Sequence, residues 1–436
     1  MTRMIRVETW FFVVALALCN TAAQPQIVIV GRGNAAADVT AVQAAVNRGG
    51  IVYIRGAFSF DQAPVDSRTI LVTTSVTILG RPDAKGNMPS ITGGTTPFRI
   101  AAPGAMVMIE GLRFVGPTSA AIQVMSAGGL RIANNRIERV RPAPLPGVAA
   151  AETGAAGIGL GMGQISGEVA IERNTIDVGG SPAERTSGIA SNPQGFEPGV
   201  RIRIAQNTIT NITAHGIDLR NVAGSATIES NVVIAGRIGS KPEGLADSFV
   251  DGIRCLGSGE YRVALNWIDV GYENAAGIRL QGNAAAMPIA RAVVTGNYVR
   301  ITAPSDSLAG AENAGIELRR ATTDAVVENN LIHGVGRTAL SVASEPGRVS
   351  MAATLWLDSR WFTAGPTQPG AGRGADVIVG SGSTDTRVAG GPGTFSIDDQ
   401  GTRTIVEHWN LQSFPARAAS SFPARSASGT SGSRGR

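Results

Sequence analysis

The chain has 436 residues and a formal net charge of +5 at pH 7, and 43 % of its residues are hydrophobic. The positive excess lies at the two ends: the first 23 residues hold two arginines and one glutamate, and the last 26 hold four arginines without an acid, which leaves 32 basic and 32 acidic residues in the body. A neutral body excludes the broad basic surface of a nucleic-acid-binding protein. Cys255 is the single cysteine of that body and the three histidines lie far apart, which excludes a disulfide framework or a cysteine-based metal site and argues against zinc.

Residues 1–23 have the features of a signal peptide. A basic start, Met1–Arg6, precedes the apolar segment Trp10–Leu18 and the small residues Thr21–Ala23. The apolar segment is too short to span a bilayer, and no later apolar run reaches membrane length, so we expect export to a secreted or periplasmic location without a transmembrane segment. Leu18 stands where lipoprotein signals have a small residue, which disfavours lipid attachment at Cys19.

Residues 24–410 are predicted to form one repeat domain. An Ala-rich segment that ends at Gly49-Gly50 predicts a short helix at about 38–48. Strand-like runs follow at 51–54, 70–72, 76–79 and 109–114. Residues 411–436 hold an octapeptide that begins Ser-Phe-Pro-Ala-Arg and occurs twice, at 413–420 and 421–428, followed mainly by Gly, Ser and Arg. This segment has no periodic apolar face, so we expect a disordered tail.

Between residues 130 and 332 one phrase recurs seven times: an aliphatic residue, two variable residues, Asn, one variable residue and an aliphatic residue. Successive Asn positions are 39, 33, 24, 35, 31 and 33 residues apart. Repeats of this length indicate stacked modules, each unable to bury its own apolar face alone. The copies are Ile132–Ile137, Ile171–Ile176, Ile204–Ile209, Ile228–Val233, Val263–Ile268, Val294–Val299 and Val327–Ile332.

A second phrase, Gly-Ile-x-Leu or a close relative, runs in step with the first. It is too short for a helix, and its apolar and variable residues alternate as in a half-buried strand. Each coil therefore contains three short strands, and the stacked coils form an all-β parallel β-helix with the short helix as its cap. We expect the Asn to lie at a bend, because it tolerates left-handed backbone, and the stacked amides to hydrogen-bond in a ladder. The copies are Ala121–Val124, Gly157–Leu160, Gly188–Ser191, Gly216–Leu219, Gly252–Cys255, Gly277–Leu280, Gly315–Leu318 and Ala339–Val342.

These phrases resemble the right-handed parallel β-helix superfamily, the pectate-lyase-like fold with its asparagine ladder. The resemblance covers roughly residues 38–410 and implies a substrate cleft on the outer face of the Gly-Ile-x-Leu strands. The motifs of the polygalacturonases, pectate lyases and alginate epimerases are absent, and His215-Gly216 is only a fragment of one of them. The resemblance therefore supplies a fold and a cleft position but transfers no catalytic residue.

In Gly-Ile-x-Leu the Ile and Leu point inward and x points outward, so the x residues should stack in one column, with neighbours about 4.8 Å apart. Two adjacent guanidinium groups in it, Arg254 and Arg279, suit the binding of carboxylate or sulfate groups. We expect Arg279, Glu317, Arg220 and Arg319 to bind substrate. The alternative is that opposite charges on adjacent strands only stabilise the sheet, by about 0.2–1 kcal/mol a pair. The column is Gln123, Gly159, Ala190, Asp218, Arg254, Arg279, Glu317 and Ser341.

His215 and Asp251 each precede the Gly of their coil, so they should lie beside Asp218 and Arg254. These four residues are the candidate catalytic group, because two carboxylates, an imidazole and a guanidinium can supply acid–base chemistry. Asp218 and Glu317 lie about 14 Å apart by strand spacing, too far for a glycosidase pair, whereas Asp218 and Asp251 fit one.

No cofactor and no metal is expected. The alternative is a calcium site with oxygen ligands from Asp251, Asp269 and Glu273. No motif in the sequence brings these three residues together.

Two functions follow from the sequence. The first is an exported monomer that binds an acidic polysaccharide or a cell-envelope glycan. If the protein is an enzyme, it cleaves this polymer as a lyase or a glycoside hydrolase. The second is a non-catalytic envelope or surface scaffold in which the charged column only pairs strands.

Overall fold

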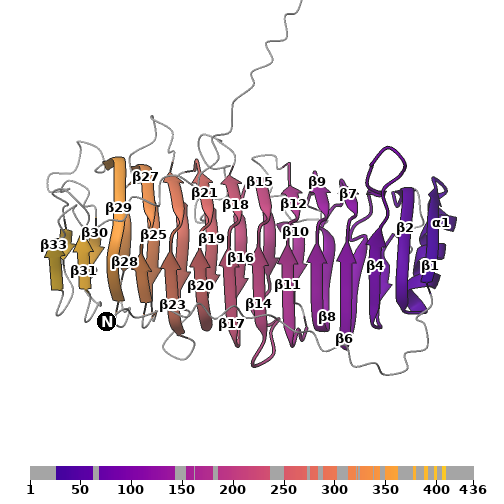
Figure 1. Ribbon diagram of the computed structural model, residues 1–436, viewed down its shortest axis with the longest axis horizontal. Coiled ribbons are helices and arrows are strands. Elements are labelled where there is room, and N and C mark those ends of the chain that lie inside the picture. Colours follow the sequence, from indigo (N-terminus) through magenta and orange to yellow (C-terminus); the bar gives the residue numbers. More distant parts are fainter. Residues whose placement is uncertain are drawn as a thin grey trace, which may run out of the picture.

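The computed structural model describes residues 26–61, 68–142, 154–161, 163–179, 185–235, 250–272, 275–282, 288–301, 313–320, 322, 325–336, 338–343, 349–361, 377–379, 387–390, 397–399 and 405–408. The predicted signal peptide and tail lie outside the described residues. Within them the chain forms the right-handed parallel β-helix that the sequence predicts, and its coils stack along one long axis (Figure 1).

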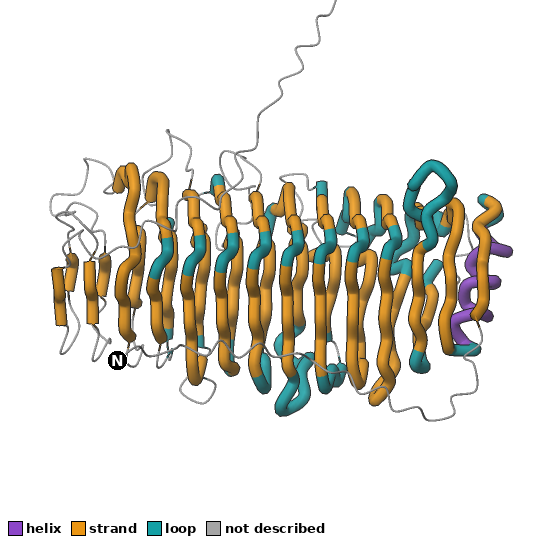
Figure 2. Tube along the Cα trace, in the orientation of Figure 1, coloured by secondary structure: helices purple, strands orange, loops and turns teal. Residues whose placement is uncertain are grey.

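The coils contribute short strands to three parallel sheets (Figure 2). Sheet 1 contains the Gly-Ile-x-Leu segments: β3 (Ile70–Val72), β6 (Phe98–Glu110), β8 (Ala120–Ala133), β10 (Gly154–Leu160), β13 (Arg185–Ser191), β16 (His215–Arg220), β19 (Val250–Leu256), β22 (Ala275–Gln281), β25 (Ala314–Arg319), β28 (Thr338–Ala343), β30 (Val377–Val379) and β32 (Ile397–Asp399).

The strands that precede each Asn form sheet 2, to which β6 and β8 also contribute their second halves: β1 (Gln26–Arg32), β2 (Gly50–Ser59), β4 (Val76–Gly80), β11 (Glu168–Glu172), β14 (Arg201–Ala205), β17 (Ser225–Glu229), β20 (Gly259–Ala264), β23 (Ile289–Thr295), β26 (Ala325–Glu328), β29 (Val349–Trp361), β31 (Arg387–Gly390) and β33 (Ile405–His408).

Sheet 3 follows the Asn positions and includes the ends of β2 and β29: β5 (Ser90–Thr92), β7 (Arg113–Val115), β9 (Arg136–Glu138), β12 (Thr175–Asp177), β15 (Thr208–Ile212), β18 (Val232–Ala235), β21 (Trp267–Val270), β24 (Tyr298–Ile301) and β27 (Leu331–Gly336).

The helix α1 spans Ala35–Asn47 and begins three residues before the predicted start. Asn34 caps it by accepting a hydrogen bond from the Ala37 amide, and Asp38 lies buried in the first turn, where it accepts from the Arg32 amide. The preceding strand β1, which pairs with β2, was not predicted. In the part of the chain that is described, no helix has the length and apolar character needed to cross a membrane.

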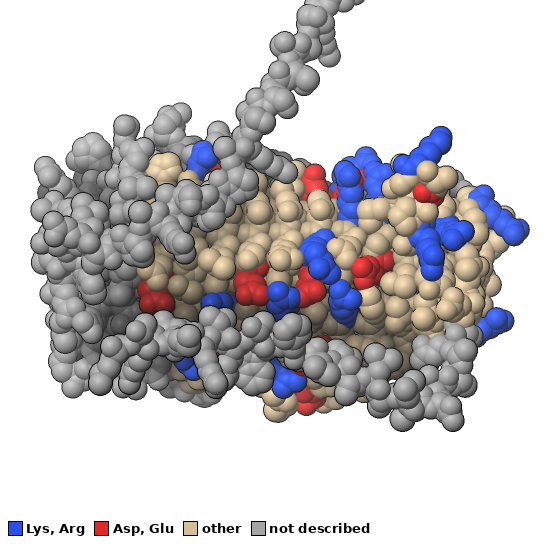
Figure 3. Space-filling model, in the orientation of Figure 1, with Lys and Arg blue, Asp and Glu red and all other residues tan. Residues whose placement is uncertain are grey.

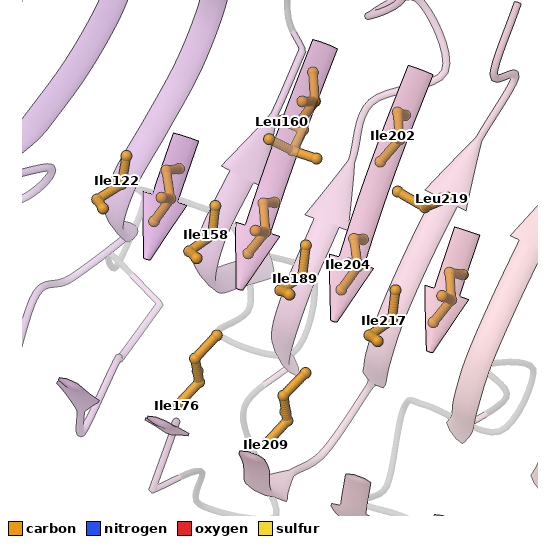
Figure 4. Close-up of a cluster of buried hydrophobic side chains, with 14 of the residues drawn as sticks. Ile122, Ile158, Leu160, Ile176, Ile189, Ile202, Ile204, Ile209, Ile217 and Leu219 are labelled. Carbon is orange, nitrogen blue, oxygen red and sulfur yellow. The ribbon is translucent and has the colours of Figure 1, made fainter. Parts of the chain in front are cut away.

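The interior is filled by columns of aliphatic side chains, one layer per coil. Figure 4 shows Ile122, Ile158, Ile189 and Ile217 at equivalent positions of successive sheet 1 strands, facing the isoleucines of the other sheets. Each of these side chains is fully buried. Because burial of an isoleucine stabilises a fold by roughly 1.5–3 kcal/mol, this repeated column is a large source of stability.

The seven Asn residues form the predicted ladder. Asn207 shows the pattern: its Nδ2 donates to the Ile171 carbonyl at 2.9 Å and to Asn231 Oδ1 at 3.0 Å, and its Oδ1 accepts from the Asn174 amide at 2.9 Å. The ladder begins at Leu112, whose amide donates to Asn135 Oδ1, and it continues to Asn330. These contacts satisfy the polar groups of a bend that is otherwise buried.

The reason for Asn at the bend differs from the expected one. The left-handed residue is the one before each ladder Asn, with φ between 54° and 65°, and not the Asn itself. Asn therefore occupies its position for its amide hydrogen bonds rather than for its backbone tolerance. The left-handed residues are Asn134, Arg173, Gln206, Ser230, Leu265, Gly296 and Asn329.

The Gly of Gly-Ile-x-Leu lies at a corner between sheets 3 and 1, where the neighbouring coil leaves no space for a side chain, although Ala121 and Ala339 occupy this position in two other coils. A Cβ on Gly216 would lie 2.2 Å from Val233 Cγ1 and 2.4 Å from the Gly252 carbonyl oxygen. This position therefore faces the interior, as does Ile217 directly after it. Two successive inward positions turn the chain, so the residue before the Gly lies on the same outer side as x.

The Gly252→Ala substitution tests this corner. Its Cβ would lie 2.3 Å from Ile268 Cγ2 and 2.6 Å from the Gly277 carbonyl oxygen, so we expect a loss of about 1–3 kcal/mol in the free energy of unfolding, measured by denaturant titration. Gly154→Ala is the matched control, because no atom lies within 4 Å of its Cβ position. Equal stability of the two variants would contradict the steric argument.

Candidate functional site

The x residues of sheet 1 form the predicted column. Backbone register pairs Asp218 with Arg254, Arg254 with Arg279, and Arg279 with Glu317. Toward the N-terminus the column continues through Ala190 and Gly159. Residues separated by about thirty positions in the sequence are therefore neighbours in space.

A second column lies beside the first and consists of the residues before each corner Gly. His215 pairs with Asp251 in register, and the His215 amide donates to Ser187 Oγ at 3.4 Å. Three adjacent polar members of this column lie on β13, β16 and β19, next to Ala190, Asp218 and Arg254, and Thr338 on β28 is a further polar member. The column is Ala120, Ala156, Ser187, His215, Asp251, Ala276, Ala314 and Thr338.

Asp218 is held by two guanidinium groups. Arg254 donates to both of its oxygens, at 2.9 and 2.7 Å, and Arg220 donates to Oδ2 at 3.0 Å. Burial alone would raise the pKa of Asp218, but the neighbouring His215 ring and the guanidinium groups of Arg254 and Arg220 hold it well below its usual value. Asp218 therefore stays ionised and serves as an anionic anchor, so it is poorly suited to donate a proton.

Asp251 lies behind His215 and is fully buried. Its Oδ1 accepts from the Ala276 amide at 3.1 Å and lies 3.2 Å from Arg279 Nη2, and its Oδ2 lies 3.6 Å from His215 Nδ1. Burial raises the pKa of Asp251 to about 6, against the opposing charge of Arg279. Of the two aspartates, Asp251 is thus the one that can exchange a proton near neutral pH.

The ion-pair network continues through Arg279 to Glu317, at 3.1 Å, and from Glu317 to Arg319. The exposed fractions of the Asp218, Arg279 and Glu317 side chains are only 4, 2 and 5 %, and that of Arg254 is 14 %. The expected open groove with Arg254 and Arg279 free for a ligand is therefore not what the structure has at these coils. Their guanidinium groups are committed to carboxylates of the chain itself.

An open hollow of about 360 Å³ lies next to this network, on the N-terminal side of Asp218. Its floor is formed by Gly159 and Ala190, because these two x residues are small. Gln123 bounds one end, and Asp218 with His215 bounds the other. The hollow thus occupies the predicted outer face of sheet 1, but two coils closer to the N-terminus than the predicted centre.

Arg185 also lines this hollow, and sequence reasoning missed it. Burial and the neighbouring charges of Arg254 and Arg220 lower its pKa, and among the described residues no carboxylate lies in ion-pair distance of it. Among the described residues that line the hollow, the guanidinium groups of Arg185 and Arg220 stand against the single carboxylate of Asp218. The position of Arg185, three residues before Gly188, carries no signal in the repeat.

His215 is one of the residues that line the hollow. Nε2 is buried and has no hydrogen-bond partner, while Nδ1 accepts from the Asp251 amide at 3.4 Å. Burial and the charge of Arg254 hold the pKa of His215 well below its usual value, so the imidazole is neutral at pH 7. An unsatisfied buried nitrogen costs free energy until a ligand or water bonds to it.

A different charged row lies on the outer face of sheet 2. Figure 3 shows acidic and basic residues alternating across this side of the molecule. Arg203 contacts Glu172 and Glu229, and Arg131 lies 3.6 Å from Glu110. These ion pairs are half-exposed and match the strand-pairing explanation, which for this row needs no ligand.

The proposed calcium ligands are not assembled among the described residues. Asp269 lies on sheet 3, at 3.7 Å from Arg300, whereas Asp251 is on sheet 1, and Glu273 lies outside the described residues. No group of three acidic, His or Cys residues within the described ranges is arranged to hold a metal ion.

Known structures share this fold at low sequence identity. A surface adhesin of Streptococcus pneumoniae, PfbA, matches with a TM-score of 0.47 and 13 % identity over 78 % of this chain and 93 % of its own. DFA-IIIase from Arthrobacter chlorophenolicus A6, in complex with DFA-III, matches with a TM-score of 0.45 and 11 % identity over 86 % of this chain and 97 % of its own.

The A-module of the mannuronan C-5 epimerase AlgE4 from Azotobacter vinelandii has a TM-score of 0.34 and 12 % identity over 87 % of this chain and 96 % of its own. At these identities and TM-scores the likeness concerns the fold alone. No protein-family model and no curated protein matches the chain.

Proposed function

We propose that this protein binds a carboxylated sugar unit of an acidic polysaccharide in the hollow over Gly159 and Ala190. The observation that carries the proposal is Arg185, a partly buried guanidinium group at the hollow without a carboxylate partner among the described residues. A buried cation of this kind is stabilised by an anionic ligand. A planar guanidinium matches a carboxylate with two parallel hydrogen bonds.

The rest of the lining suits a sugar. Ser191 and Asn192 supply polar atoms for hydroxyl groups, and the small floor residues leave space for a ring. His215 also lines the hollow, and its buried Nε2 has no hydrogen-bond partner. Because Nδ1 of the neutral imidazole accepts from the Asp251 amide, Nε2 carries the hydrogen, so the His215 side chain is a hydrogen-bond donor at this site.

Removal of Arg185 tests the binding site. We expect Arg185→Ala to weaken binding of polygalacturonate, alginate or rhamnogalacturonan by about 10- to 100-fold, because a hydrogen-bonded charge contact contributes about 1.5–3 kcal/mol. Calorimetry at low salt measures this affinity. Arg201→Ala, which removes an exposed arginine of sheet 2, is the control and should leave binding unchanged.

Filling the hollow tests its location without changing charge. Ala190→Leu would place a larger side chain on the floor and should also abolish binding, whereas a neutral glucan should bind none of these proteins. Unchanged affinity of both Arg185→Ala and Ala190→Leu for the polymer that binds the wild type would refute the site.

Product analysis then separates binding from catalysis. Unsaturated sugar ends would identify a lyase, and new reducing ends would identify a hydrolase. Binding without products would identify a binding protein.

The second candidate function is a scaffold. It is favoured by the closed ion pairs of Arg254, Arg279 and Glu317, which leave these charges no capacity for a ligand. Absence of binding to all three acidic polymers would support it.

A further inference from the structure

The column that floors the hollow is asymmetric along the helix axis. Beyond Asp218 it is filled by the buried network of Arg254, Arg279 and Glu317, so that a ligand in the hollow meets a closed end there. In the opposite direction Gln123 is half-buried, and its side-chain oxygen lies over Gly159. Gln123 therefore separates the hollow from the next strand of sheet 1, and its side chain reaches back over the floor of the hollow.

One strand beyond Gln123, the column reaches Arg99. The two residues are paired in backbone register, and Arg99 is exposed between the buried side chains of Phe98 and Ile100. Within the described part of the chain no carboxylate forms an ion pair with Arg99. It lies three strand spacings from Ala190, about 14 Å along the axis.

We propose, building on the proposed function, that the site recognises the end of an anionic sugar chain. The terminal unit occupies the hollow, with its carboxylate at Arg185 and its far side against the closed end formed by Asp218 and His215. The following units pass over Gln123, and a later carboxylate reaches Arg99, which acts as a second anion-binding position. The chain therefore lies along the groove in one direction and cannot pass through it.

Oligogalacturonates of increasing length test Arg99. In the wild type, affinity should rise with length until the oligomer reaches Arg99 and then stay constant. Arg99→Ala should bind the monomer as the wild type does, but bind the longest oligomer about three- to fivefold more weakly, as expected for an exposed ion contact. Arg201→Ala is the control, and calorimetry is the measurement. Equal affinity of Arg99→Ala and wild type for every length would overturn the role of Arg99.

Stoichiometry tests end recognition. At constant uronate mass, shortening the polymer by partial acid hydrolysis multiplies chain ends, so the number of protein molecules bound should increase in the same proportion. If the number of bound protein molecules depended only on total uronate mass, the sugar chain would lie through the groove, and the inference would be overturned. If no uronate oligomer binds at all, the proposed function itself fails, and this outcome is distinct from both of the others.

Discussion

Replacement of Asp218 by alanine is expected to lower the free energy of unfolding by about 3–5 kcal/mol, the range found when one partner of a buried ion pair is removed. Arg254 would lose both of its hydrogen bonds while its side chain is only 14 % exposed. Arg220 would lose its carboxylate too, and Arg185 would remain close to both. Three guanidinium groups without an anion would then repel one another. Denaturant unfolding followed by circular dichroism measures the loss.

A matched control separates burial from charge. Glu168→Ala breaks an ion pair with Arg201 in which both side chains are about 70 % exposed, so its cost should stay below about 1 kcal/mol. The double variant Asp218→Ala with Arg254→Leu should recover part of the lost stability, because it removes the uncompensated charge. A single Asp218→Ala variant as stable as Glu168→Ala would mean that water screens this pair.

The position of residues along the repeat could be predicted from the sequence. Because one phrase recurs in every coil, Asp218, Arg254, Arg279 and Glu317 were expected to stack, and the register shows that they do. The Asn ladder was predictable for the same reason, since a polar residue at an invariant place between buried aliphatic residues needs partners in the neighbouring coil.

The face on which His215 lies could be predicted only by taking the corner at Gly216 into account. Strand alternation alone puts His215 and Ile217 on the same face, which would bury the imidazole in the core. The corner Gly216 adds an extra inward position, so His215 instead lies outside with Asp218. A signal was present in the sequence: the residue before the corner Gly is Ala in three coils, and it is polar in the coils of Ser187, His215 and Asp251.

Exposure could not be predicted from the repeat. A place in the column gives the face of a residue, but it does not show which charges pair or how deeply they lie. Arg279 was expected to bind a ligand, yet it bridges Asp251 and Glu317 with 2 % of its side chain exposed. Gly159 and Ala190 received no role because they carry no chemistry, although their small size is what creates the hollow.

The same two columns predict an unusual dependence of stability on pH. Burial raises the pKa of Asp251 from 3.8 to about 6, so between these values the folded protein holds a proton that the unfolded chain has released. Acidification from pH 6 therefore stabilises the fold through Asp251, by on the order of 2–3 kcal/mol when complete. For His215 the pKa is lowered from 6.5, so the unfolded chain takes up its proton first, and acidification destabilises the fold.

In the wild type the two contributions oppose each other in the same range, so the free energy of unfolding should vary little between about pH 4.5 and 6.5. His215→Gln removes the destabilising contribution and should become more stable as the pH falls, whereas Asp251→Asn should become less stable. The charges that face the pair are the same in both variants: Arg279, Arg254 and Glu317 act on Asp251, and Arg254, Asp218, Arg220 and Arg185 act on His215. Denaturant titrations at several pH values measure the slopes. Slopes of equal sign in the two variants would mean that Asp251 and His215 do not titrate as the buried pair that the site requires, because only opposite shifts of their pKa values produce opposite slopes.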